Sequence, residues 1–120
     1  MEFKENRPIF IQIADNFCER ILTGSLKNEE RIPSVRETAA EFQVNPNTVV
    51  RTYNYLQETG IIRNQRGIGY FLTSDARNRT LSSRQNHFLN KELPQLFKTM
   101  SILKIDRDTL IAYYDDYINK

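Results

Sequence analysis

The sequence predicts a mainly α-helical fold with one small β-hairpin, because its apolar residues change period along the chain. They recur at helical spacing over residues 8–60 and again over residues 88–118. Between these segments, residues 61–72 hold short strand-forming runs on either side of a glycine-containing turn. We therefore expect a compact head at residues 1–75 and a helical linker and tail at residues 76–120.

The composition limits the classes of protein that this chain can represent. It has 120 residues, a net charge of +2 and one cysteine, Cys18, which cannot form an internal disulfide. It lacks an apolar run of the roughly 18 to 20 residues that cross a bilayer, and its start, "MEFKENRPIF", lacks the order of a signal peptide. These features predict a cytoplasmic protein with no membrane partner. The small positive charge is compatible with nucleic acid but is weak evidence for it.

Catalytic and metal-binding chemistry has little support in the sequence. The lone histidine, His87, has no cysteine or histidine companion at metal-ligand spacing, and Cys18 fits a buried structural thiol. "GIG" at residues 67–69 is too short for a phosphate loop. We expect no enzyme activity, no cofactor, no metal site and no catalytic residue.

The first helix is predicted from about Pro8 to Thr23. Proline favours a first helical turn, and Gly24 is a typical terminator. The apolar residues of this segment fall on one stripe: Phe10, Ala14, Phe17, Cys18 and Ile21.

Two further short helices follow across a tight corner. Ser34 and Glu37 form a capping-box pattern, which predicts a helix over residues 35–42. Asn45 is a favourable N-cap for a third helix, and the proline after it suits the first helical position. Gly60 is expected to end this helix. Its inward face is predicted to hold Val49, Tyr53 and Leu56.

A hairpin and a polar segment come next. The strands are predicted at residues 61–64 and 69–72, with "QRGI" as the tip. Residues 74–86 have no apolar period, so they are either a linker or the polar start of a helix. The arginines of this segment either favour DNA or are solvated linker charges: Arg77, Arg79 and Arg84.

The tail regains a helical period from Phe88 to Leu103, with Pro94 expected to break or kink it. Asp106 is a plausible cap for a last helix, which carries its own apolar stripe. So many apolar residues are hard to hide within two helices. We therefore expect a twofold homodimer through residues 84–118, although a tail folded back on its own head would give a monomer.

Short helices joined by a corner and followed by a hairpin form a winged helix-turn-helix pattern. This geometry places the start of the third helix in the major groove of double-stranded DNA. Asn47 and Thr48 can offer side chains to bases or phosphates, and free amides of that turn suit a phosphate oxygen. Arg51 can make a bidentate contact to guanine. Alternatively, this stretch is an ordinary helix entry and Arg51 is a solvated charge.

Arginines outside the third helix add to the pattern. Arg36 lies in the first turn of the second helix, which crosses the phosphate backbone in this geometry. Arg66 stands beside Gly67 at the hairpin tip, where glycine permits close approach and arginine suits a phosphate or the minor groove. Arg63 and Gln65 are weaker candidates. Each charge could instead only solubilise the surface.

The run "RIPSVRETAAEFQVNPNTVVRTYNYLQETGIIRNQRGIGYFL" resembles the DNA-binding head of the GntR family of bacterial transcription regulators, and "PIFIQIADNFCERILTGSL" resembles its entry helix. "VNPNTV" and the short tail are similar to the YtrA-type subgroup. Many family members carry arginine where Pro46 and Val50 stand here, so those contacts are missing. By the resemblance, the positions that contact DNA are Arg36, Asn45, Asn47, Thr48, Arg51 and Gly67.

The resemblance implies a transcription regulator, expected to be a repressor that binds a palindromic operator as a dimer. The fold class is therefore a winged helix-turn-helix head plus a C-terminal two-helix dimerisation tail. The tail is too short to enclose a usual ligand pocket within one subunit, so any small-molecule effector, of unknown identity, would act at the dimer interface. A winged-helix module that binds protein without DNA is the alternative.

Overall fold

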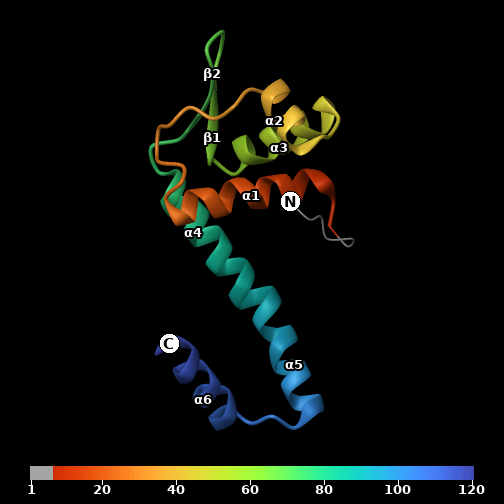
Figure 1. Ribbon diagram of the computed structural model, residues 1–120, viewed down its shortest axis with the longest axis vertical. Coiled ribbons are helices and arrows are strands. Elements are labelled where there is room, and N and C mark those ends of the chain that lie inside the picture. The colour runs from red at the N-terminus through yellow and green to blue at the C-terminus, as the bar shows by residue number, and fades with distance from the viewer. Residues whose placement is uncertain (1–6) are drawn as a thin grey trace. The chain divides into compact units, whose positions relative to one another are not determined.

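The computed structural model describes residues 7–120, and the chain divides into compact units at Ser83 and Arg84. We call the unit up to Ser83 the head and the unit from Arg84 the tail. Figure 1 shows the elements in chain order along the colour bar. The head contains α1 (Ile9–Thr23), α2 (Val35–Phe42), α3 (Pro46–Glu58), β1 (Ile62–Gln65), β2 (Gly69–Leu72) and most of α4 (Ala76–His87). The tail contains η1 (Phe88–Glu92), α5 (Leu93–Leu103) and α6 (Arg107–Ile118).

The predicted helices of the head are confirmed, with small shifts at their ends. α1 ends at Thr23, as predicted, and its C-cap Gly24 adopts the left-handed conformation with φ of +89°. α2 begins with both bonds of the capping box between Ser34 and Glu37. α3 ends at Glu58 with Thr59 as its C-cap, and Gly60 follows in the left-handed conformation with φ of +77°, as predicted for a terminator. β1 begins at Ile62, one residue later than predicted.

The core of the head lies where α1, α2 and α3 meet. The apolar stripes predicted for α1 and α3 supply about half of its buried side chains, and the base of the hairpin adds Ile62 and Leu72. Tyr53 is fully buried, and its hydroxyl donates to the carbonyl of Pro33 at 2.6 Å and lies 2.7 Å from the Thr38 hydroxyl. The Thr52 hydroxyl donates to the carbonyl of Phe10 at 2.8 Å, which ties α3 to α1. Apolar burial and these polar contacts therefore hold α3 in place against α1 and α2.

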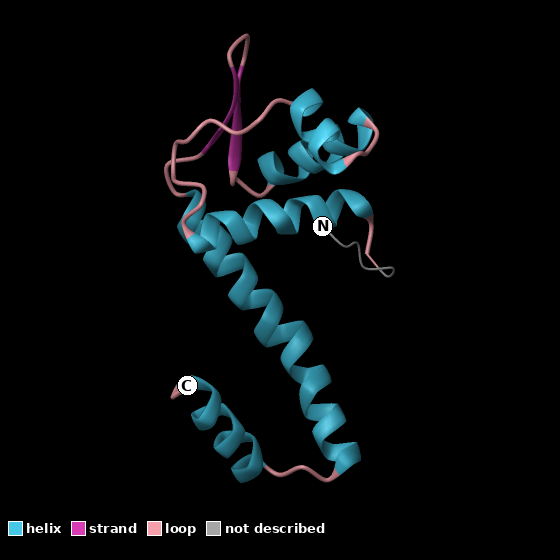
Figure 2. Ribbon diagram, viewed as in Figure 1, coloured by secondary structure: helices cyan, strands magenta, loops and turns pink. Residues whose placement is uncertain are grey.

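The β1–β2 hairpin, which we call the wing, is antiparallel, with Ile62 opposite Leu72 and Gln65 opposite Gly69. Figure 2 draws strands in the wing alone among residues 7–120, and the hairpin stands out from the helices of the head. Residues 30–32 lie along the free side of β2. The amide of Ile32 donates to the Tyr70 carbonyl at 3.0 Å, and the amide of Leu72 donates to the Glu30 carbonyl at 2.8 Å.

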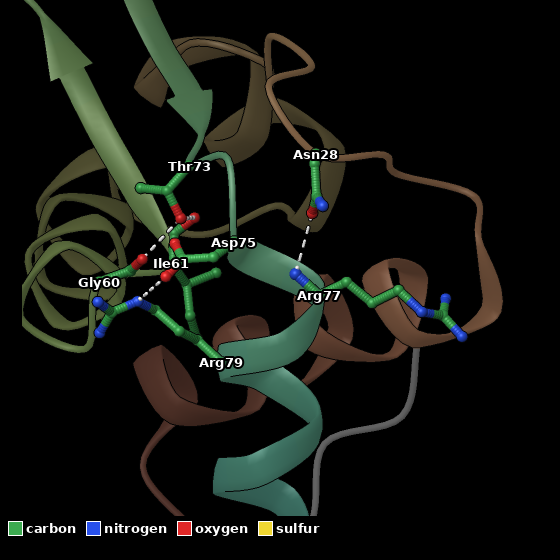
Figure 3. Close-up of polar contacts among 7 residues, drawn as sticks. All are labelled: Asn28, Gly60, Ile61, Thr73, Asp75, Arg77 and Arg79. Carbon is green, nitrogen blue, oxygen red and sulfur yellow. Dashed lines mark hydrogen bonds and ion pairs between the residues drawn. The ribbon is translucent and has the colours of Figure 1, made fainter.

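The polar segment after the wing is the helix α4, so the linker alternative is wrong. Its first turn is anchored on the head by polar contacts, of which Figure 3 shows the hydrogen bond to Asn28 and the Asp75–Arg79 ion pair. The amide of Arg77 donates to the Asn28 side chain at 3.0 Å, and its guanidinium donates to the Leu22 carbonyl at the end of α1 at 3.2 Å. Arg79 pairs with Asp75 at 2.7 Å and lies against Gly60. The interpretation of Arg77 and Arg79 as purely solvated linker charges is therefore wrong.

Of the two roles expected for Pro94, a break in the helix is contradicted. Helical backbone continues on both sides of the proline, which is the second residue of α5, so it does not break the helix. The turn before it takes the wider π form, in which the Leu93 amide donates to the Phe88 carbonyl. The cap predicted for the last helix is confirmed, because the Thr109 amide donates to the Asp106 carboxylate at 2.9 Å.

The tail has no core of its own, since none of its side chains is buried. The half or more exposed apolar residues include Leu89, Phe97, Ile102, Leu103, Tyr113, Tyr114, Tyr117 and Ile118. Within residues 7–120, none of the helices combines the length and the apolar character that crossing a bilayer requires.

Candidate nucleic-acid interface

The start of α3 presents polar side chains at the surface of the head. Asn45, Asn47 and Arg51 are exposed, and Thr48 is half-buried. The Asn45 side chain accepts a hydrogen bond from the Asn47 amide at 2.8 Å, so its carbonyl oxygen is committed to capping, while the residue as a whole is exposed. Pro46 occupies the first helical position, as predicted. This end of α3 is therefore rigid and carries hydrogen-bonding groups on an open surface.

The backbone amides of that turn are less available than the sequence suggests. Proline has no amide hydrogen, the Asn47 amide is bonded to the cap, and the Thr48 amide donates to the Asn45 carbonyl at 2.9 Å. The expectation that free amides there receive a phosphate is therefore wrong for this conformation. A ligand at this end of the helix would be contacted by side chains instead.

Arg51 is exposed but is not a freely solvated charge. Its guanidinium carbon lies 4.2 Å from the centre of the Phe10 ring, in cation–π contact with the first turn of α1. The same ring meets Tyr55 edge to face, with the ring centres 6.4 Å apart. Arg51 and Tyr55 are one helical turn apart on α3, so Phe10 packs against two side chains of that helix.

Arg36 is the second residue of α2, and its side chain is exposed. It makes no hydrogen bond, ion pair or ring contact with any other residue between 7 and 120. The capping box beside it fixes the start of α2, because the Ser34 amide donates to the Glu37 carboxylate at 3.0 Å. The backbone and side-chain hydrogen bonds with Ser34, the backbone one first, lower the pKa of Glu37, so the charged carboxylate favours the capped helix start. Arg36 is thus available to an external partner.

The tip of the wing combines a free arginine with a glycine turn. Gly67 has φ of +80°, and a Cβ added there would meet nothing within 4 Å. Glycine is therefore required by the backbone conformation rather than by crowding. Arg66 beside it is exposed and has no partner among the described residues. Arg63 is different, since its guanidinium lies 4.8 Å from the centre of the Phe71 ring and donates to Gln65.

Arg31 also positions the wing, and the sequence reasoning did not single it out. Its guanidinium donates to the Ile68 carbonyl at 2.8 Å and lies so close to Gly69 that a Cβ there would approach Arg31 to 3.0 Å. The backbone of Arg31 pairs with that of Phe71. Arg31 therefore braces the tip that carries Arg66. Only the glycine at position 69 hinted at a close approach, and nothing in the sequence identified the neighbour.

The head thus places predicted site residues on α2, on the start of α3 and on the wing, where each reaches solvent. Among residues 7–120, no group of three histidine, cysteine, aspartate or glutamate side chains could hold a metal ion. Cys18 is buried in α1, as expected. The arrangement suits hydrogen-bonding and ionic contact with a polyanion.

Comparison with known proteins agrees with this geometry. Residues 11–72 match the model of the family described as bacterial regulatory proteins, gntR family. The chain is 40% identical over 75 residues to the uncharacterized HTH-type transcriptional regulator YhcF of Bacillus subtilis, a match that covers 62% of each chain. It is 36% identical over 93 residues to the HTH-type transcriptional repressor YtrA of the same organism, covering 78% of this chain and 71% of YtrA.

A solved structure extends the likeness to the tail. The chain is similar to a GntR family transcriptional regulator from Listeria monocytogenes, with 33% identity and a TM-score of 0.79. That match covers 95% of this chain and 98% of the other. The predicted fold class, a winged helix-turn-helix head with C-terminal helices, is therefore confirmed, and so is the family resemblance.

Proposed function

This chain belongs to the gntR family of bacterial regulatory proteins, and we propose that it is a sequence-specific DNA-binding transcription regulator. The observation that carries the proposal is the open polar start of α3 with a free Arg36 on α2 and a free Arg66 on the wing. Residues 1–75 would bind DNA and residues 76–120 would assemble the dimer. The contacting residues would be Arg36, Asn45, Asn47, Thr48, Arg51, Arg66 and Gly67.

These residues divide by the contact that each would make. Arg36 and Arg66 have free guanidinium groups on a helix start and a hairpin tip, which suits phosphate contacts that position the protein. Asn47 and Arg51 lie on α3, which would enter the major groove, and their side chains can make bidentate contacts to adenine and guanine. Gly67 would let the wing approach the duplex closely.

The proposal is tested by alanine substitution of one residue from each class. The probe is a duplex that the wild-type protein selects from random-sequence DNA, compared with a scrambled duplex at stated salt. Arg36→Ala should weaken both to a similar extent and reduce the salt slope by about 1. Arg51→Ala should cost about 1 to 3 kcal/mol on the selected duplex and relax specificity. Lys27→Ala removes one positive charge from an exposed position of the head, outside the proposed contacts, and serves as the control. Unchanged affinity in both test variants would favour a protein-binding module instead.

The proposal extends to a homodimer through residues 84–118 on a palindromic operator, where each head addresses one half-site. It is supported by the exposed apolar surface of the tail. We place the protein in the cytoplasm and assign it repression, by blocking access to a promoter, partly because the relative YtrA is named a repressor. A reporter under a promoter that contains the selected duplex tests the direction: expression should fall when the protein is present.

A small-molecule effector, if the regulator has one, would act at the dimer interface and alter the spacing of the heads. The short tail supports this idea, since residues 84–120 leave little chain to enclose a ligand within one subunit. Titration of candidate metabolites while DNA affinity is followed tests it. An affinity that responds to none of them would count against an effector.

A further inference from the structure

We propose that Phe10 is a positioning residue for DNA recognition, which holds the guanidinium of Arg51 in the orientation that reads a base. The inference rests on the proposed function and deepens it. It starts from a contact between α1 and α3, in which the guanidinium carbon of Arg51 lies 4.2 Å from the centre of the Phe10 ring. The pattern of the sequence assigns Phe10 to the apolar stripe of its helix, and nothing in that pattern links it to a DNA contact.

Phe10 is itself fixed by the helix that carries Arg51. The Thr52 hydroxyl donates to the Phe10 carbonyl at 2.8 Å, so the backbone of this residue is tied to α3. Tyr55 packs edge to face on the Phe10 ring, with an interplanar angle of 77°. Neighbouring residues of α3 therefore hold the backbone and the ring, and the ring forms a defined platform under Arg51.

A guanidinium group on an aromatic ring keeps its hydrogen-bonding capacity. The cation–π contact uses the flat face of the group, whereas the N–H donors point outward in its plane. A bidentate contact to the O6 and N7 atoms of guanine uses those same in-plane donors. Since Arg51 remains exposed in this arrangement, the face is occupied while the edge stays available to a duplex.

Holding Arg51 on the ring favours binding because a free arginine side chain has many rotamers. Immobilising such a side chain at an interface opposes association, and an arrangement already fixed in the free protein reduces that cost. Phe10 would therefore raise affinity for the correct sequence without touching DNA. Its effect should be seen only where Arg51 makes its specific contact.

The test compares Phe10→Leu, which removes the ring face but retains apolar volume, with Phe10→Tyr, which retains the face. The probes are the duplex selected by the wild-type protein and its scrambled counterpart. Phe10→Leu should weaken binding to the selected duplex about three- to tenfold, a size set by ordering one flexible side chain. Binding to the scrambled duplex should change little, and Phe10→Tyr should bind like the wild type. Thermal unfolding of each variant checks that the head is folded.

A double-mutant cycle separates positioning from a structural effect. In an Arg51→Ala background, Phe10→Leu should cause no further loss. An equal loss with and without Arg51, an equal loss on both duplexes, or tighter binding after removal of the ring would overturn the inference. Arg36→Ala separates a failure of the Phe10 role from a failure of the DNA-binding function. If it weakens binding while Phe10→Leu does not, the DNA-binding function stands and the role of Phe10 falls. If neither Arg36→Ala nor Arg51→Ala weakens binding, the function itself falls.

Discussion

The head and the tail use similar apolar residues in opposite ways. In the head, short helices and the base of the wing close around a core in which Val49, Tyr53, Leu56 and Leu72 are fully buried. In the tail, Leu103 is 61% exposed and Tyr117 is 76% exposed, and no side chain is buried. Both units are helical, so secondary structure alone does not decide whether apolar surface is removed from water.

The difference shows that helical periodicity predicts a buried face but not what buries it. The stripes of α1 and α3 meet each other and leave the polar start of α3 for a partner. The stripes of α5 and α6 have no such cover within residues 84–120. Since an exposed apolar surface of this kind commonly marks an interaction site, the tail fits assembly and the head fits recognition.

The strongest test of this contrast makes the same substitution in both units. Leu56→Ala should lower the free energy of unfolding by about 2 to 5 kcal/mol, because a fully buried side chain leaves a cavity. Leu103→Ala should change the unfolding of the head by less than about 0.5 kcal/mol, as for an exposed position. Chemical denaturation followed by amide hydrogen exchange of residues in the head measures both. Equal losses would show that the tail shares the cooperative core of the head.

A charge on the tail should break assembly without unfolding the head. Phe97 is 51% exposed on α5, and Phe97→Asp would place an unpaired carboxylate in the proposed interface. We expect monomers in sedimentation. Affinity for a duplex with paired half-sites should fall about 100-fold, because the second head no longer binds at high effective concentration.

Gln95→Asp supplies the control for this variant, since it adds the same charge at an exposed polar position of α5. It should remain dimeric. A Phe97→Asp protein that is still a dimer with unchanged DNA affinity would contradict the assignment of assembly to the tail.

Local signals predicted most of the head because its helices begin and end at residues with specific chemistry. Ser34 with Glu37, Asn45 with the proline after it, and Gly24 each act within a few residues, so their roles can be deduced from spacing. The helix α4 could not be predicted with the same certainty, because its polar sequence has no apolar period. It is held on the head by contacts with residues that are distant in the sequence. The Arg77 amide reaches Asn28, which is 49 positions away in the chain.

The sequence predicted which residue types stand at the candidate site and where they lie in the chain. It did not predict which other residues they contact. Exposure of Arg36 and Arg66 and the positive φ of Gly67 agree with the prediction, whereas the role of each in DNA binding stays a prediction. The brace formed by Arg31 and the platform under Arg51 depend on tertiary approach. A single sequence carries no signal for which distant side chain meets which.

The buried hydroxyl of Tyr53 should distinguish the head from the tail at high pH. Tyr53→Phe leaves the Thr38 hydroxyl and the Pro33 carbonyl without this partner, which should cost about 1 to 3 kcal/mol. Burial raises the pKa of Tyr53 to about 12, above the value of about 10 expected in the unfolded chain. The neutral phenol therefore stabilises the fold fully below about pH 10, and this contribution is lost as pH rises toward 12.

Denaturation over this pH range should show a steeper loss of stability in the wild type than in Tyr53→Phe. Tyr113→Phe alters an exposed tyrosine of the tail and should leave the unfolding of the head unchanged. Identical alkaline slopes in the wild type and in Tyr53→Phe would mean that Tyr53 does not titrate with unfolding.

The smallest expected effect is the loss of helix stability in acid, which each unit should show through the carboxylate that caps one of its helices. Hydrogen bonds from Ser34 lower the pKa of Glu37 in the head, and hydrogen bonds from Thr109 lower the pKa of Asp106 in the tail. A lowered pKa means that each carboxylate stabilises its helix above its unfolded pKa, and that this contribution is lost as pH falls through the folded value. Both units should therefore loosen in acid, each through its own cap.

Glu37→Gln and Asp106→Asn keep a hydrogen-bond acceptor at each cap but remove the titration. Amide hydrogen exchange, followed region by region as pH is lowered from neutrality, should show a flatter response in α2 for the first variant and in α6 for the second. Each variant is the control for the other, because neither change should reach the helix of the other unit. If Asp106→Asn altered the acid response of α2, the head and tail would open as one cooperative unit. The contrast between a self-sufficient head and a tail without a core would then no longer hold.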